Sequence, residues 1–185
     1  VAGNQTTLNG VGDVRKTAYE RANVATIANF DMYQSQNIVT HTVGPLGGTP
    51  LVNGASQNVT YANAVGSNWS QGLITDGWTA AAALRLNAGD VFTIAGVFAV
   101  NPVPGEGSKQ AMPYLQQFTV LSDFSSSAGG AGTITISPPM IVSGPFQTVS
   151  AAPADNAVIT VLGTAATGYS QNIGFHKNAF ALVTV

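Results

Sequence analysis

The side chains of this sequence that could perform acid–base or metal chemistry are few and scattered. The two histidines, His41 and His176, have no second histidine or carboxylate at the spacing that metal-binding motifs use. The eight acidic residues form no D-x-D or E-x-x-E cluster, and cysteine is absent. Each histidine is therefore better interpreted as a partly buried or hydrogen-bonded residue of a strand. We expect no metal site and no catalytic residue.

Serine and glycine are abundant, but they lack the motifs of nucleophilic catalysis and phosphate binding. The sequence contains no G-x-S-x-G turn, which presents the nucleophilic serine in many hydrolases. The glycine-rich segment GPLGGTP, residues 44–50, is not followed by the Lys-Ser/Thr pair of a phosphate-binding loop. The sequence therefore predicts a protein that is not an enzyme and that needs no cofactor.

Two tryptophans, Trp69 and Trp78, flank the segment SQGLITDG. Exposed aromatic rings can line a sugar-binding face, whereas buried ones anchor cores and interfaces. We favour the core or interface role. A sugar-binding role of the two tryptophans would instead indicate an alternative function, that of a β-rich adhesin or carbohydrate-binding surface domain.

Charged residues make up only 8% of the 185 residues, whereas soluble domains average about 25%. The six basic residues are scattered and the formal net charge is -2, so we expect no nucleic-acid-binding face. No apolar run reaches the roughly 18 residues of a membrane-spanning helix. A surface of Ser, Thr, Asn, Gln and Gly suits a protein that packs against its neighbours, although secreted adhesion domains share this composition.

Short segments of alternating apolar residues, separated by turn residues, occupy the middle of the sequence. No helical run lies between them, which is typical of a small antiparallel β-barrel or sandwich of about six strands. Residues 101–113 are predicted to form a long irregular loop, either a surface connection or a contact arm. The six predicted strands are 58–62, 80–86, 91–95, 115–124, 133–137 and 157–162.

The two ends of the sequence are predicted to be pieces of one scaffold around this β domain. Residues 13–22 are predicted to form a short helix capped by Asp13, which leads into a strand over 24–33. A polar link then leads to a second extended run over 37–43. Near the other end, residues 172–185 are predicted to form two short strands joined by a polar turn.

Three parts of the sequence resemble the major capsid proteins of tailed phages, of the P22-coat type. The first part is VATIANFDMYQSQNI at 24–38, which follows the predicted helix. The second comprises AGDVFTIAGVFAVNPV at 88–103, LQQFTV at 115–120 and TITISPP at 133–139. The third is NIGFHKNAFALVTV at 172–185. They occur in the order in which the family has them.

The resemblance implies a mainly β chain in which a small antiparallel β-barrel is inserted into part of an α+β HK97-like capsid core. Residues 1–43 and 168–185 would then belong to the core, and residues 44–167 would be the insertion domain. It also implies that the chain is a fragment of a major capsid protein. The insertion domain would stabilise the subunit and make contacts within or between capsomers. Residues 57–72 carry no charge, so ionic contacts through that loop are not implied.

The partners implied by the resemblance are other copies of the chain, which form an icosahedral shell as homo-oligomers. Scaffolding, portal or decoration proteins are further expected partners, and membranes and specific nucleic acid are not. The expected location is the virion, after assembly in the cytoplasm of a bacterial host. The predicted interface residues are Trp69, Trp78, Phe98, Glu106, Lys109, Met112 and Tyr114.

Overall fold

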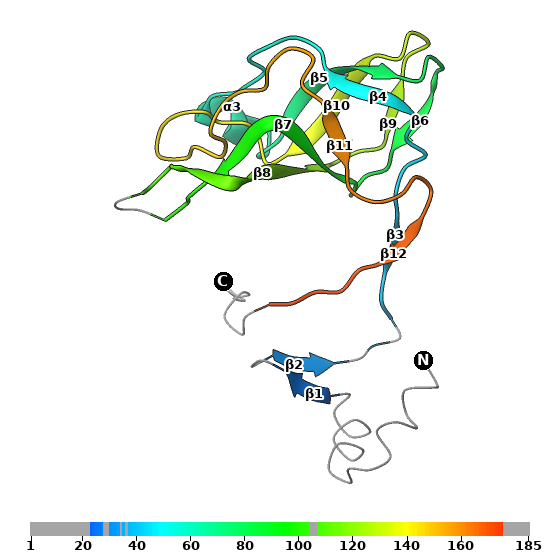
Figure 1. Ribbon diagram of the computed structural model, residues 1–185, viewed down its shortest axis with the longest axis vertical. Helices are drawn as coiled ribbons and strands as arrows, with labels where there is room; N and C mark the ends of the chain where they lie inside the picture. Colours follow the sequence, from blue (N-terminus) through cyan, green and yellow to red (C-terminus); the bar gives the residue numbers. More distant parts are fainter. Residues whose placement is uncertain (1–22, 28–29, 34, 36, 104–106, 176–185) are drawn as a thin grey trace. The chain divides into compact units, whose positions relative to one another are not determined.

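The computed structural model describes residues 23–27, 30–33, 35, 37–103 and 107–175 (Figure 1). These residues belong to two compact units. One unit holds residues 41–169, and the other holds the described residues on either side of it. The predicted limits of the inserted domain, 44 and 167, both lie inside the larger unit. The predicted helix over 13–22 lies outside the described residues.

The larger unit is built on one antiparallel sheet of six strands, in which strands distant in sequence lie side by side (Figure 1). The two edge strands approach each other, because Leu51 and Val158 form a β-bridge and the Val52 N–H donates to the Ala157 carbonyl at 3.0 Å. The sheet is therefore a nearly closed barrel, as predicted. Its order is β11 (Ile159–Val161), β7 (Val91–Val100), β8 (Ala111–Val120), β10 (Gly132–Ser137), β5 (Gln71–Trp78) and β4 (Gly48–Val52).

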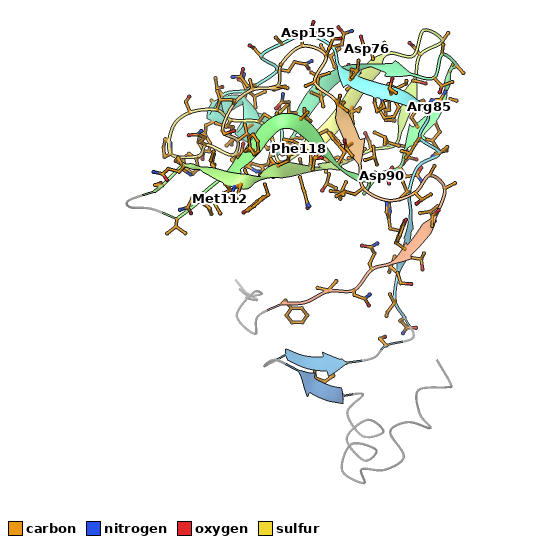
Figure 2. The ribbon with its side chains drawn as sticks, viewed as in Figure 1. Asp76, Arg85, Asp90, Met112, Phe118 and Asp155 are labelled. Carbon is orange, nitrogen blue, oxygen red and sulfur yellow. The ribbon has the colours of Figure 1, made fainter. Side chains whose placement is uncertain are left out.

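The barrel is filled by the inward-facing side chains of these strands. Phe92 of β7 and Phe118 of β8 lie opposite each other, with ring centroids 5.8 Å apart, and both are fully buried. Burial of such a side chain contributes about 1.5–3 kcal/mol. Ile134 and Ile136 of β10 complete the same core. Figure 2 labels Phe118. Every residue of the core lies between residues 46 and 161, so the core belongs to this unit alone.

One predicted strand is wrong. Residues 58–62 lead into a short helix, α3 (Tyr61–Gly66), instead of forming a strand. The Thr60 hydroxyl accepts a hydrogen bond from the Asn63 N–H at 3.3 Å, which is the bond that a helix N-cap makes. The alternation of Val59 and Tyr61 was too short to outweigh this cap.

Strands β4 and β5 were not predicted, because glycine and proline interrupt their apolar patterns. Pro50 is tolerated in β4 because β4 is an edge strand, where a missing N–H breaks no second ladder. Residues 101–113 were predicted to be irregular, yet β8 begins at Ala111 and pairs there with Val100 of β7. The last three residues of the predicted loop therefore belong to a strand, whereas its other described residues, 101–103 and 107–110, form the irregular connection between β7 and β8. A separate two-stranded sheet joins β6 (Ala83–Leu86) and β9 (Phe124–Ser126).

The smaller unit contains a hairpin where one strand was predicted over 24–33. Strands β1 (Asn23–Ile27) and β2 (Phe30–Tyr33) pair antiparallel, with Ile27 opposite Phe30. The three-residue spacing of this apolar pair breaks the two-residue period of a single strand, which explains the error. Strand β3 (Thr40–Thr42) pairs with β12 (Gly168–Ser170), and all residues of these two strands except Thr40 and Ser170 belong to the larger unit. Most of the predicted strands over 172–185 lie outside the described residues.

Candidate interaction surfaces

A histidine and a buried aspartate meet where the chain enters the barrel. The His41 Nε2 atom lies 2.8 Å from Oδ1 of Asp90, whose side chain is fully buried. The second oxygen of Asp90 accepts hydrogen bonds from the N–H groups of Gly44, at 3.0 Å, and Asn87, at 2.8 Å. Both carboxylate oxygens are therefore satisfied within the protein, and Figure 2 shows Asp90 at the end of the barrel that the connecting segments reach.

A His–Asp pair also occurs in hydrolases, where the imidazole activates a nucleophile. Within the described residues, no serine or threonine hydroxyl is hydrogen-bonded to His41, and no three acidic or histidine side chains could hold a metal. The prediction that His41 is a hydrogen-bonded strand histidine is confirmed. Its partner could not be predicted because Asp90 is distant in sequence. His176 lies outside the described residues.

The segments that enter and leave the barrel are hydrogen-bonded to each other. The Val43 N–H donates to the Thr167 carbonyl at 3.1 Å, and the Ala166 N–H donates to the Gly44 carbonyl at 3.2 Å. The Asn87 side chain donates to the Thr42 carbonyl at 2.8 Å. We call residues 41–44 and 163–169 the neck. The Asp90 carboxylate and the Asn87 amide both fasten the entering segment of the neck to the barrel.

The leaving segment of the neck is held by Tyr169. Hydrogen bonds from Thr164, from its side chain and from its backbone N–H at 3.0 Å, lower the pKa of the exposed Tyr169 phenol. Gly163 lies beside this ring with a φ of +100°, and a Cβ there would approach Cγ2 of Val43 to 2.9 Å. A larger residue at this position would push the two segments apart.

An open groove of about 300 Å³ lies where the edges β4 and β11 of the barrel separate. It is lined by Leu46, Gly47, Gly48, Thr49, Pro50, Trp78, Val158, Ile159, Thr160 and Val161. None of these residues is ionisable. The groove therefore offers no general acid, base or charged ligand.

Four of the predicted interface residues lie on the hairpin of β7 and β8 or in its connection. Phe98 and Tyr114 are exposed, and the pairing of Phe98 with Leu115 brings them to neighbouring positions. Met112 and Lys109 are half-buried, and the Lys109 ammonium lies 3.5 Å from the Gln147 carbonyl. Figure 2 shows Met112 near the end of the hairpin away from Asp90. Glu106 lies outside the described residues.

The structure buries Trp78 in the core, where it also lines the groove between β4 and β11. Only 4% of its surface is exposed, and its indole N–H donates to the Thr75 hydroxyl at 3.0 Å. Its ring also packs against Phe124, at a centroid distance of 5.4 Å. Trp69 is half-buried on the surface. A sugar-binding face that uses both tryptophans therefore does not form.

Trp69 instead belongs to a surface cluster that the sequence did not reveal. The rings of Tyr61 and Phe146 stack at a centroid distance of 4.0 Å and an interplanar angle of 12°. Trp69 meets Tyr61 edge-on at 6.1 Å, and Val65 is exposed on the same helix as Tyr61. We call these four residues the aromatic patch. Phe146 comes from a loop far along the chain, so no local pattern linked it to Tyr61.

The two segments that build the aromatic patch contain no charged residue, although the Lys109 ammonium lies 3.5 Å from the carbonyl of Gln147, the neighbour of Phe146. Residues 44–75, which include α3, contain no Asp, Glu, Lys or Arg, and neither do residues 124–154, which include Phe146. Nearly half of the Phe146 side chain is exposed, as is that of Tyr61. Aromatic rings in a setting poor in charged residues are typical of the buried centre of protein interfaces.

Comparison with known proteins assigns the chain to a family. The family model described as "P22 coat protein - gene protein 5" matches residues 1–185. Among solved structures, the CUS-3 coat protein I-domain is similar, with 28% identity over 64% of this chain and 98% of that chain, and a TM-score of 0.39. A search of curated proteins finds no match. Because the family model covers all 185 residues, the chain belongs to the P22 coat protein family, and its role is that of a structural phage capsid protein and not an enzyme.

Proposed function

We propose that the barrel is the insertion domain of a major capsid protein, in which residues 1–43 and 168–185 form part of an HK97-like core. The family match over residues 1–185 is the observation that carries this proposal. The insertion domain stabilises the subunit and contacts neighbouring copies within or between capsomers. Assembly takes place in the host cytoplasm, and scaffolding, portal or decoration proteins are additional partners of the finished or growing shell.

The neck supports a stabilising role for the barrel. A long insertion normally weakens its host, because closing the loop between its ends costs conformational entropy. Here the barrel has its own core, and the hydrogen bond from Val43 to Thr167 holds the two ends of the insertion together. A folded barrel therefore delivers both connecting segments to the capsid core at a fixed separation.

The hairpin of β7 and β8 supports a role in contacts between subunits. It presents Phe98 and Tyr114 at the surface, and aromatic side chains are enriched in protein interfaces. Lys109 and Met112 belong to the same hairpin or its connection, and Glu106 lies between the two strands in sequence; we propose all three as further contact residues.

Deletion of the insertion domain tests this proposal. Full-length coat protein is expressed either intact or with residues 44–167 replaced by a short Gly/Ser linker, and soluble protein and sedimenting shells are measured. The intact protein is expected to form closed shells. The deletion is expected to lower soluble protein at least tenfold and to abolish shells. Shells formed by the deletion variant at the yield of the intact protein would contradict a stabilising role.

A further inference from the structure

We propose that Asn53 is a site of spontaneous deamidation, and that the Asp155 carboxylate slows this reaction in the folded barrel by holding the Gly54 N–H. The inference names a modification site and the residue that controls it. It concerns the chemistry of the barrel alone and goes beyond the capsid function proposed above.

The Asn53–Gly54 pair has the sequence in which a side-chain amide is most open to attack by its own backbone. In deamidation, the backbone nitrogen of the residue after the asparagine bonds to the side-chain carbon Cγ, and the Cγ–Nδ2 bond breaks. The ammonia that leaves carries the proton of the attacking nitrogen. Water then opens the resulting ring and gives aspartate or isoaspartate. Glycine in the second place favours the attack, because it has no Cβ to hinder it.

The Asn53 side chain is available for this reaction. It is exposed, and within the described residues its carboxamide takes part in no hydrogen bond. Gly54 has a φ of +96°, and a Cβ there would meet nothing within 4 Å. No packing contact therefore prevents the carboxamide from turning toward the backbone.

The attacking nitrogen, in contrast, is held. The Gly54 N–H donates to Oδ1 of Asp155 at 2.8 Å, and Oδ2 of Asp155 accepts a hydrogen bond from the Asn156 side chain at 2.9 Å. The nitrogen must give up this bond and its proton to attack Asn53. A carboxylate is too weak a base to remove a peptide proton, and its negative charge opposes the growth of negative charge on the nitrogen. Asp155 therefore slows the reaction.

The pair lies where the barrel closes. On one side of Asn53, the Val52 N–H donates to the Ala157 carbonyl at 3.0 Å. On the other side, the Ser56 N–H donates to the Pro153 carbonyl at 3.0 Å. Isoaspartate would lengthen the backbone by a carbon atom between these two bonds. Protection of Asn53 therefore preserves the register of the closure.

A second asparagine offers an internal comparison. The Ala88 N–H, which follows Asn87, donates to Oδ1 of Asp123 at 2.8 Å, and Asp123 is exposed like Asp155. The Asn87 side chain is engaged, however, because its Nδ2 donates to the Thr42 carbonyl at 2.8 Å. Loss of the Asp123 carboxylate should therefore leave Asn87 intact.

The first test measures the rate of deamidation at Asn53 in full-length, unassembled coat protein at neutral pH, by tandem mass spectrometry of timed samples. Asp155→Ala is expected to raise this rate about tenfold, because a hydrogen bond to a charged acceptor is lost. Asp123→Ala, the matched control, should change the rate at neither asparagine. Asn53→Gln in the Asp155→Ala protein should abolish the reaction at this position, since glutamine would have to form a larger ring. Circular dichroism shows whether each variant is folded.

A further control separates loss of this one bond from general loosening of the turn. The Gln57 side chain donates to the carbonyls of Asn53, at 2.8 Å, and Gly54, at 3.2 Å, and it accepts from the Ile74 N–H at 2.7 Å. Gln57→Ala removes these contacts but leaves the Gly54 N–H on Asp155. It should raise the rate at Asn53 much less than Asp155→Ala does.

The second test needs no variant and uses the unaltered protein, either folded or unfolded in urea. Unfolding releases the Gly54 N–H from Asp155, so the rate at Asn53 is expected to be about tenfold higher in urea. This comparison decides the question if Asp155→Ala does not fold.

The outcomes are distinct. A faster reaction in folded Asp155→Ala, with Gln57→Ala and Asp123→Ala close to the unaltered protein, supports the inference. A slower reaction in Asp155→Ala would show that the carboxylate acts as a base, and an equal acceleration by Gln57→Ala would show that rigidity alone protects Asn53. Either result overturns the inference, as do equal rates in the folded and unfolded unaltered protein. The capsid function stands or falls separately, on shell formation.

Discussion

The Arg85 guanidinium donates a hydrogen bond from Nε to the Ser126 hydroxyl at 3.0 Å, in the interior of the larger unit. Its other nitrogens donate to the carbonyls of Leu46, at 3.1 Å, and Thr79, at 2.9 Å. Within the described residues, no carboxylate lies at ion-pair distance from Arg85. A buried cation is thus stabilised by neutral oxygens from three separate segments, which it joins together (Figure 2).

Replacing Arg85 with methionine should destabilise the barrel by about 2–4 kcal/mol, because the buried Ser126 hydroxyl and the part-buried carbonyls of Leu46 and Thr79 would lose their donor. Urea unfolding of residues 41–169 measures this loss. Lys109→Met is the matched control, since Lys109 makes one long contact, and it should cost less than about 1 kcal/mol. Equal losses in the two variants would contradict the role given to Arg85.

The segment of residues 41–169 should fold without the rest of the chain, because its core lies entirely within it. We expect one cooperative transition in urea, with the same midpoint by circular dichroism and by tryptophan fluorescence. Phe118→Ala should lower the stability by about 3–5 kcal/mol. A gradual, non-cooperative loss of signal would show that the barrel needs the flanking segments.

Two aspartates allow the neck to be tested by matched substitutions. Asp90 is buried and accepts three hydrogen bonds, so Asp90→Ala should cost about 2–4 kcal/mol. Asp123 is exposed and accepts one, from the Ala88 N–H at 2.8 Å, so Asp123→Ala should cost about 1 kcal/mol or less. Both are measured by urea unfolding of residues 41–169. A larger loss for Asp123→Ala would show that Asp90 does not fasten the neck.

Alanine substitutions at two glycines with the same backbone conformation, Gly89 and Gly54, measure how closely the His41 ring packs against Gly89. Gly89 has a φ of +97° and Gly54 a φ of +96°, so alanine is strained at both positions by about 1–2 kcal/mol. A Cβ at Gly89 would lie 3.1 Å from Cε1 of His41, whereas a Cβ at Gly54 meets nothing within 4 Å. Gly89→Ala should therefore be the more destabilising variant.

Removal of the His41 ring supplies the control for this comparison. In a His41→Ala background, the effect of Gly89→Ala on the free energy of unfolding should fall to that of Gly54→Ala. This double-mutant cycle assigns the difference to the ring contact. An unchanged effect of Gly89→Ala in that background would show that His41 does not pack on Gly89.

The strands that sequence predicted best are those with an unbroken period of two. Ile134 and Ile136 alternate with Thr133 and Thr135, and β10 is found where it was expected. Strand β5 was missed although Leu73, Thr75 and Trp78 are all buried. Gly77, with a φ of +72°, shifts Trp78 out of the alternation. A local pattern therefore fails where the backbone departs from regular extension.

The interaction surfaces were less predictable because they depend on contacts between distant segments. The aromatic patch needs α3 and the Phe146 loop to meet, and the neck needs Asp90 to face His41. Neither pairing has a sequence motif. Trp78 was predicted to lie in an interface because of its residue type, whereas the fold buries it in the core. Residue type indicated candidates, and the topology decided between core and surface.

Electron microscopy of purified particles of the full-length protein, with mass spectrometry of the same fraction, tests the central claim most directly. We expect closed icosahedral shells of one size in which this chain is the main protein. Filaments, surface appendages or dispersed monomers as the form that contains the chain would contradict a capsid role.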